Sequence, residues 1–309
     1  MRRQLFFTLL LIASAYGSAW AVDSPDETSR AFALALHAAM EDPAQDLAMQ
    51  IECTNEQGIR SLHLYTEGVA IWNQQVQVGI DGKVRERLLE ELLKADFPSF
   101  ETHYGGKANS GRIEAPNIVM CSIQVQTGGL EKASYQDVNG ERSVTFMKLA
   151  ASLLDAVEPL GVQGVRANSM TDALALLKQG RLAPQILVLR VMHLPADATQ
   201  AGGMLRIESG KLSRRSYQPG VNVGDWVTAP LDADTFHTVV QQLLDTEVWL
   251  LPQALPSSDT YQVNIIVLNH SLLIRSRPLN NQAVQQKTAQ GTAFTALADS
   301  LLSLHPATQ

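Results

Sequence analysis

The two halves of this sequence resemble each other, and this internal duplication constrains the fold more than any other feature. The best match joins residues 146–154 (FMKLAASLL) with residues 294–302 (FTALADSLL), which are identical at six of nine positions. The other matches pair residues 90–97 (EELLKADF) with 241–248 (QQLLDTEV), and residues 32–36 (FALAL) with 172–176 (DALAL). Because the matches occur in the same order in both halves, they indicate that one structural module is present twice.

The apolar residues of the matched segments have helical spacing, and the stretches between them alternate as strands do. The first half is predicted to contain strands over 47–54, 60–65, 75–80, 118–126 and 130–138, with a helix over 84–94. The second half is predicted to contain strands over 185–193, 204–208, 212–217, 261–268 and 272–277, with a helix over 232–245. Asp232 is the expected N-cap of that helix, and hairpin turns are expected at 128–129 and 269–271.

The predicted fold class is α+β, with two tandem copies of a β-β-β-α-β-β-α module, each preceded by a helix. Each module should form a mostly antiparallel sheet with its helices on one face. The first module is expected over residues 22–160 and the second over 161–309, joined by a short connection over 158–169. We expect two related modules of this kind to pack about a pseudo-two-fold axis and to leave a groove between them.

The N-terminus has the three parts of a cleavable signal peptide over residues 1–21. Arg2 and Arg3 are followed by an apolar stretch over 5–15, and Ala19-Trp20-Ala21 is a small-x-small cleavage site. A retained anchor is the rival interpretation, but the apolar stretch is short for a membrane span. The sequence therefore predicts a periplasmic protein, or alternatively an extracellular one, with no transmembrane segment in the mature chain.

Cys53 and Cys121 are the two cysteines, and each lies in an apolar, strand-like run. In an oxidising compartment they are expected to form a disulfide, which would close a long loop and contribute about 4 kcal/mol in the chain-entropy model. Two reduced core thiols, or a metal or redox pair, are the alternatives. Aligning the two halves places Cys53 near Val191 and Cys121 near Ile265. Both cysteines are therefore expected to face the core from adjacent strands.

Composition argues against some classes of partner. The formal net charge is −7, and loss of Arg2 and Arg3 with the signal peptide takes it to −9. A net acidic chain does not suit nucleic-acid binding, which relies on clustered Lys and Arg, so no nucleic-acid partner is expected. The same charge disfavours an anionic membrane surface.

Motifs for catalysis and cofactor binding are missing from the sequence. It contains no G-x-S-x-G or S-x-x-K nucleophile motif and no P-loop. The histidines, none of them in a metal-binding spacing, are His37, His63, His103, His193, His237, His270 and His305. We therefore assign no catalytic residue, no metal site and no cofactor from the sequence.

Two polar clusters are candidates for binding a ligand or partner. The first is the glycine-rich loop over 100–116, which is longer than its counterpart over 250–260; the alternative is an ordinary mobile surface loop. The second is a basic cluster that could hold an anion or an acidic partner surface, and the alternative is an edge strand protected by charge. The candidates are His103, Tyr104, Lys107 and Arg112 in the loop, and Arg206, Lys211, Arg214 and Arg215 in the basic cluster, with Arg275 and Arg277 on a later strand.

The sequence favours a protein that acts by binding a protein or small molecule, as an accessory or interaction factor. One alternative is a periplasmic hydrolase with its site in the groove between the modules, and another is a structural envelope component. An enzyme site should place polar residues in one copy where the other copy has core residues.

Overall fold

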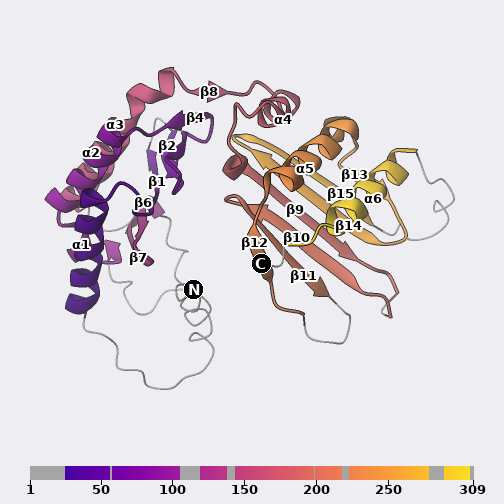
Figure 1. The fold of residues 1–309 in the computed structure, drawn as a ribbon, viewed down its shortest axis with the longest axis horizontal. Helices are drawn as coiled ribbons and strands as arrows, with labels where there is room; N and C mark the ends of the chain where they lie inside the picture. Colours follow the sequence, from indigo (N-terminus) through magenta and orange to yellow (C-terminus); the bar gives the residue numbers. More distant parts are fainter. Residues whose placement is uncertain are drawn as a thin grey trace, which may run out of the picture.

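The computed structural model describes residues 25–55, 58–104, 119–137, 143–197, 199–217, 223–277 and 289–306. The predicted signal peptide lies outside these residues. The described chain forms two β-sheets, each with helices against one face (Figure 1). The α+β class and the two-module architecture are therefore confirmed.

The first sheet has the strand order β5-β7-β6-β1-β2-β3-β4-β8, antiparallel except for β5 beside β7. Helices α1 (Pro25–Glu41), α2 (Gly82–Lys94) and α3 (Val144–Val157) lie together along one side of it (Figure 1), with 3-10 turns η1 (Phe97–Ser99) and η2 (Glu158–Val162). The strands are β1 (Leu47–Asn55), β2 (Gly58–Leu64), β3 (Val69–Trp72), β4 (Val76–Gly79), β5 (His103–Tyr104), β6 (Val119–Thr127), β7 (Leu130–Asp137) and β8 (Val165–Arg166).

The second sheet has the order β12-β11-β10-β9-β14-β15-β13, antiparallel except for β13 beside β15. Its helices are α4 (Met170–Lys178), α5 (Ala233–Asp245) and α6 (Ala289–Leu302), with η3 (Pro184–Ile186) and η4 (Val248–Leu250). The strands are β9 (Leu187–Leu194), β10 (Gly202–Glu208), β11 (Lys211–Tyr217), β12 (Val227–Pro230), β13 (Ala254–Pro256), β14 (Thr260–Val267) and β15 (His270–Arg277).

The two sheets are copies of one topology. When the strand order of the second sheet is read in reverse, its strands match those of the first sheet one by one: β9 matches β1, β10 matches β2, β11 matches β3, β12 matches β4, β13 matches β5, β14 matches β6 and β15 matches β7. The module is therefore β-β-β-β-α-β-β-β-α, with one more strand before the middle helix and one more after it than the sequence pattern predicts. The additional strands are β3 and β5 in the first module, and β12 and β13 in the second. Only β8, which belongs to the connection between the modules, has no counterpart.

Matching side chains stabilise matching positions in the two modules. Asp81 accepts a hydrogen bond from the Val84 N–H at the start of α2, and Asp232 does the same for Thr235 at the start of α5. The predicted N-cap at Asp232 is therefore confirmed. Helices α3 and α6 bury the same face against their sheets: Phe146, Leu149, Ala150, Leu153 and Leu154 in one, and Phe294, Leu297, Ala298, Leu301 and Leu302 in the other.

The predicted disulfide between Cys53 and Cys121 is present, and the two cysteines face each other across β1 and β6. The sequence alignment of these cysteines with Val191 and Ile265 is wrong. Leu47 lies opposite Thr127 in the first module and Leu187 lies opposite Val267 in the second.

Counting from these pairs, His193 takes the place of Cys53 and Tyr261 takes the place of Cys121. These two residues also face each other across their strands, and their rings stack at 4.3 Å with an interplanar angle of 11°. An aromatic stack in the second copy thus occupies the position of the covalent bond in the first.

The connection between the modules is structured, although its glycines suggest mild flexibility. Its short strand β8 pairs antiparallel with β4. The Gln77 side chain of β4 also donates to the Arg181 carbonyl at 3.2 Å and accepts from the Ala183 N–H at 2.7 Å. Val69 and Ile71 of β3 pack against the hydrophobic core of the second module. The modules therefore share both hydrogen bonds and apolar contacts.

Among the described helices, none is long and apolar enough to cross a membrane.

Replacing both cysteines by serine should lower the free energy of unfolding of the first module by about 4 kcal/mol, because the unfolded chain gains the entropy of an open loop. Hydrogen exchange followed residue by residue checks this. Amides of β1 and β6 should exchange faster in the double variant, whereas those of β9 and β14 should keep their rates. Equal exchange in β1 and β6 before and after the substitution would contradict the stabilising role of the bond.

Gly164 precedes β8 and lies against β4 so closely that a side chain does not fit. A Cβ atom there would run into the Val76 side chain and lie 2.6 Å from the Gln77 carbonyl oxygen. Gly164→Ala should therefore destabilise the protein by about 1–3 kcal/mol, as overpacking does. Gly79→Ala is the matched control, because its Cβ would meet no atom within 4 Å. Urea unfolding of both variants tests the difference, and equal midpoints would contradict it.

Candidate functional site

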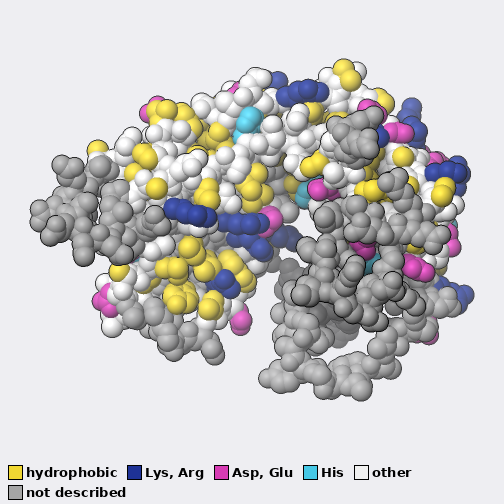
Figure 2. Space-filling view, turned by 180° about the vertical axis from the view of Figure 1, so that it is seen from behind, with side chains coloured by type: hydrophobic (Ala, Val, Ile, Leu, Met, Phe, Trp, Pro, Cys, Tyr) yellow, Lys and Arg dark blue, Asp and Glu magenta, His cyan; other side chains and the backbone are white. Residues whose placement is uncertain are grey.

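The face of the second sheet opposite the helices carries a group of arginines. Leu189, Val191, Leu205 and Ile207 point into the core, so the residues that alternate with them point to the helix-free face. We call this surface, with Arg190 on β9, Arg206 on β10, Arg215 on β11 and Arg275 on β15, the arginine face. Figure 2 shows Lys and Arg side chains in a row across this side of the second module, beside an apolar patch.

The strand registers place these arginines in two neighbouring rows. In one row Thr228, Ser213, Arg206 and Arg190 lie opposite one another in turn across four strands. In the other, Arg215, Met204, Met192, Gln262 and Arg275 are paired in the same way. Because neighbouring strands lie about 4.8 Å apart, guanidinium groups in these rows can contact one extended ligand.

Trp226, just before β12, lies between two of these arginines. The guanidinium carbon of Arg206 is 5.4 Å from the centre of the Trp226 ring, and that of Arg215 is 4.6 Å from it. Arg215 also donates from Nε and Nη2 to the sulfur of Met204, at 3.2 and 3.0 Å. The indole ring and the thioether therefore orient Arg215 without neutralising its charge.

Glu208 is the one carboxylate that forms ion pairs with the arginine face among the described residues. Its carboxylate lies 3.6 Å from Arg190 and 3.4 Å from Arg206. The charge of Glu208 also affects the pKa values of two residues of the first module, Tyr65 and His63. Burial raises the pKa of Tyr65 to about 12, and the charge of Glu208 adds to this effect. Burial lowers the pKa of His63, and Glu208 opposes that shift.

An arrangement of this kind can bind anions. Each guanidinium presents a planar set of donors that matches a carboxylate or phosphate group, and several of them have donors without a hydrogen-bond partner among the described residues. The charge of Glu208 is shared between two arginines, so the face keeps a net positive charge. Such a surface in an acidic protein can attract a negatively charged partner.

The predicted basic cluster is divided between the two faces of the sheet. Arg206, Lys211 and Arg215 lie on the helix-free face. Lys211 is on this face because it lies opposite Glu208, which is two residues from Arg206 along β10. Arg214 pairs with Leu205, so it points to the helix side, where it donates to the His305 ring at 2.6 Å.

The alternative of a charge-protected edge does not describe this cluster. The charged residues lie on β10 and β11, and the edge strand is β12.

The described part of the predicted loop cluster lies on the first sheet, so the structure does not bring it together with the basic cluster in one surface. His103 and Tyr104 form β5. The His103 ring stacks on Tyr135 at 5.1 Å, and the Tyr104 ring packs against Phe100 and Phe146. Both side chains thus hold the edge strand β5 against the rest of the first module. Lys107 and Arg112 lie outside the described residues.

Sequence reasoning missed Trp226 and Arg190. Arg190 alternates with Leu189 and Val191 in a strand that was predicted, so its outward position could have been derived from the spacing alone. Trp226 lies beyond the end of β11, and nothing in the sequence indicates that it returns to the same face.

A second polar cluster surrounds the stacked His193 and Tyr261 rings. His193 Nε2 lies 3.0 Å from a carboxylate oxygen of Asp259, and the Ala196 N–H donates to the other oxygen at 3.1 Å. Burial raises the pKa of Tyr261, and the charge of Asp299 on α6 raises it further. Position 299 matches Ala151 in the first module, so polar groups replace a disulfide and an alanine here.

Such asymmetry is what an enzyme site would produce, but the cluster lacks a nucleophile. In the part of the chain that the structure describes, the His193 ring is bonded to Asp259 and to no hydroxyl or thiol group. The geometry is that of a histidine held between a carboxylate and an aromatic ring. We therefore regard the cluster as a set of polar contacts that stabilises the pairing of β9 with β14.

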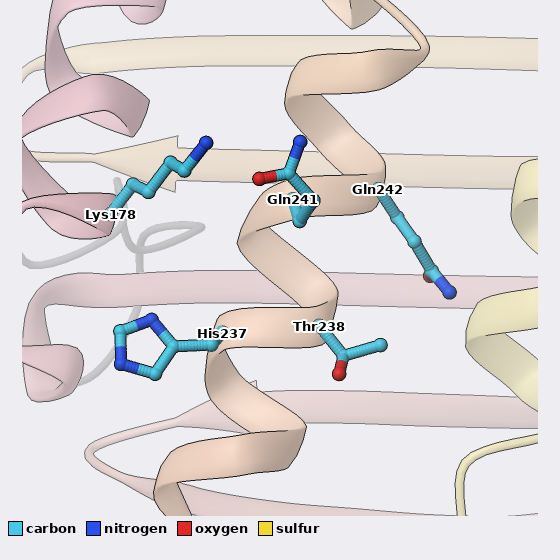
Figure 3. A pocket seen from close by; sticks show the side chains of 5 residues that line it. All are labelled: Lys178, His237, Thr238, Gln241 and Gln242. Atoms are coloured by element: carbon cyan, nitrogen blue, oxygen red, sulfur yellow. The ribbon is translucent and has the colours of Figure 1, made fainter.

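A hollow of about 380 Å³ lies between α4 and α5, lined by Lys178, His237, Thr238, Gln241 and Gln242. Figure 3 shows Lys178, His237 and Gln241 on the same side of α5, whereas Gln242 points away from them. Gln242 donates instead to Ser300 of α6 at 2.9 Å. The side chains do not converge on one point, so the hollow has no evident ligand.

The described residues contain no group of three or more His, Cys, Asp or Glu residues that could hold a metal ion. No protein-family model matches the chain, and no curated protein is significantly similar to it.

Asp259→Asn should destabilise the second module at neutral pH by about 2 kcal/mol, because it removes a charged hydrogen-bond acceptor. Burial opposes ionisation of Asp259, but the bonds from Ala196 and His193 and the charge of His193 lower its pKa below the ordinary 3.8. A lowered pKa stabilises the fold above pH 3.8, and this contribution is lost as pH falls through the folded-state pKa.

Thermal unfolding between pH 2 and pH 7 tests this expectation. The gap between wild type and Asp259→Asn should be widest at pH 7 and should close toward pH 2. Asp225→Asn, at an exposed carboxylate, serves as control and should follow the wild type throughout. A gap that does not change with pH would show that the charge of Asp259 is not what stabilises the loop.

Proposed function

We propose that this protein acts by binding, and that its arginine face holds a protein partner that presents carboxylate groups. The observation that carries the proposal is the excess of guanidinium groups on one sheet face, with Glu208 as their ion-pair partner among the described residues. Exposed arginine charge costs little in water, but its concentration on one face of an acidic chain favours association with an acidic surface.

The side chains between the arginines support a protein partner. Met192, Met204 and Trp226 add polarizable, apolar surface to the charged rows. Trp, Met and Arg are the residue types enriched at protein interfaces, and centrally placed aromatic and arginine side chains contribute most of the binding energy there. A free inorganic anion would gain no binding energy from contact with these apolar side chains.

Export to the periplasm remains part of the proposal. The disulfide between Cys53 and Cys121 supports an oxidising compartment, because such bonds persist outside the cytosol. The predicted signal peptide is consistent with it. Mass spectrometry of the mature N-terminus of protein expressed with residues 1–21 tests the cleavage after Ala21.

The binding function can be tested with a glutamate-rich peptide as probe and Trp226 fluorescence as signal. The double variant Arg206→Glu/Arg215→Glu should bind the peptide at least about tenfold more weakly than wild type, since each charge reversal turns attraction into repulsion. Binding to wild type should weaken with added salt.

The matched control is Lys94→Glu/Lys148→Glu, which changes the net charge equally at exposed helical positions of the first module. It should bind like wild type. Equal loss in both double variants would show that net charge, and not the arginine face, governs binding. Preference of the face for a sulfated polysaccharide over the glutamate-rich peptide would contradict an acidic protein as partner.

A further inference from the structure

The two modules differ at one sheet edge. In the sheet of the first module, β8 lies beside β4 on its outer side and pairs with it. Val76 lies opposite Arg166, and Gln77 lies opposite Val165. The matching strand of the second module, β12, ends its sheet, and no described strand pairs with its outer side. Figure 1 shows β12 at the margin of the second sheet.

The effect of this difference is visible in one pair of matching valines. Val76 lies opposite Trp72 in β3, and Val227 lies opposite Arg214 in the matching strand β11. Val76 is 2% exposed, because β8 and the preceding Gly164 lie against it. Val227 is 60% exposed. The first module therefore shows how this edge is covered, and the second presents the same edge uncovered.

Exposed apolar side chains occur in β12 and in the residues just before it. Trp226 is 38% exposed and Val223 is 44% exposed, and both are close to Val227 in the sequence. Natural edge strands commonly carry charged side chains that prevent pairing with another chain. Strand β12, with the sequence VTAP, carries no charge, although it is short and ends in Pro230. An uncharged edge with exposed apolar residues is what β-strand addition requires.

We propose that the outer side of β12 is a docking edge, to which an extended segment of the partner adds antiparallel, as β8 adds to β4. This inference rests on the proposed function, because it takes the partner to be acidic. The segment would become the outermost strand of the second sheet, and its backbone would pair with the outward N–H and C=O of Thr228, because Pro230 has no N–H and the N–H groups of Val227 and Ala229 point to β11.

The two faces of the sheet determine the side chains that such a segment carries. A residue opposite Thr228 would lie on the helix-free face, in the row that continues to Ser213, Arg206 and Arg190. A carboxylate at that position would approach Trp226 and the guanidinium groups beside it. A residue opposite Val227 would lie on the helix side, next to an exposed valine. The fitting segment therefore alternates acidic and apolar residues.

An eight-residue peptide of alternating valine and glutamate tests this inference, with a block peptide of four valines and four glutamates as composition control. The alternating peptide should bind at least about tenfold more tightly, since only it can present its carboxylates on one face of a strand. In hydrogen-exchange NMR of the complex, the amide of Thr228, whose N–H points to the outer side of β12, should gain protection.

Substitution at Val227 gives an independent readout. Val227→Asp puts a carboxylate against the apolar side chain that the bound segment presents there, and it should weaken binding of the alternating peptide at least about tenfold, because the charge loses water without gaining a partner. Ile59→Asp is the matched control, because Ile59 is a strand residue of the first module that is 51% exposed. It should leave binding unchanged, and circular dichroism verifies that both variants are folded.

The outcomes separate this inference from the proposed function. If both peptides bind equally, depend on Arg206 and Arg215, and leave the Thr228 amide unprotected, the arginine face binds acidic chains but strand addition is wrong. If neither peptide binds wild type, both the proposed function and the docking edge are overturned. Protection of β12 by the alternating peptide alone supports the docking edge.

Discussion

Each sheet of this protein has to bury one apolar face, and the helices of the same module do so. Phe146 and Leu153 of α3 close the first core, and Phe294 and Leu301 of α6 close the second in the same way. Burial of such side chains contributes about 1.5–3 kcal/mol each, so the covered face is fixed in both copies. The helices do not cover the opposite face, and on the second sheet that face carries the arginines.

The sequence was sufficient for features that depend on period and local chemistry. The matched helices, the N-cap at Asp232 and the disulfide between Cys53 and Cys121 were all predicted, because amphipathic spacing, capping and cysteine usage are local signals. The short strands β3 and β12 were missed, since four residues are too few for an alternating pattern to stand out. The signal peptide and the candidate site stay predictions of the sequence.

The error in aligning the cysteines has a physical cause. Val191 lies two residues from the true counterpart of Cys53, and Ile265 lies four residues from that of Cys121. A strand shifted by an even number of residues keeps the same side chains on the core face, so a hydrophobic pattern cannot distinguish these registers. Cross-strand pairing does distinguish them, and it shows a histidine and a tyrosine where apolar residues were expected.

Glu208, at the end of β10, interacts with groups of both modules that are far apart in the sequence. Its carboxylate balances Arg190 and Arg206, and the same charge bears on His63 and Tyr65 in the first module. A ligand carboxylate that takes over those arginines would compete with Glu208 and alter the field at the half-buried His63 imidazole. Occupation of the second module would then be coupled to proton uptake or release by the first, and the heat of binding would vary with the ionisation enthalpy of the buffer.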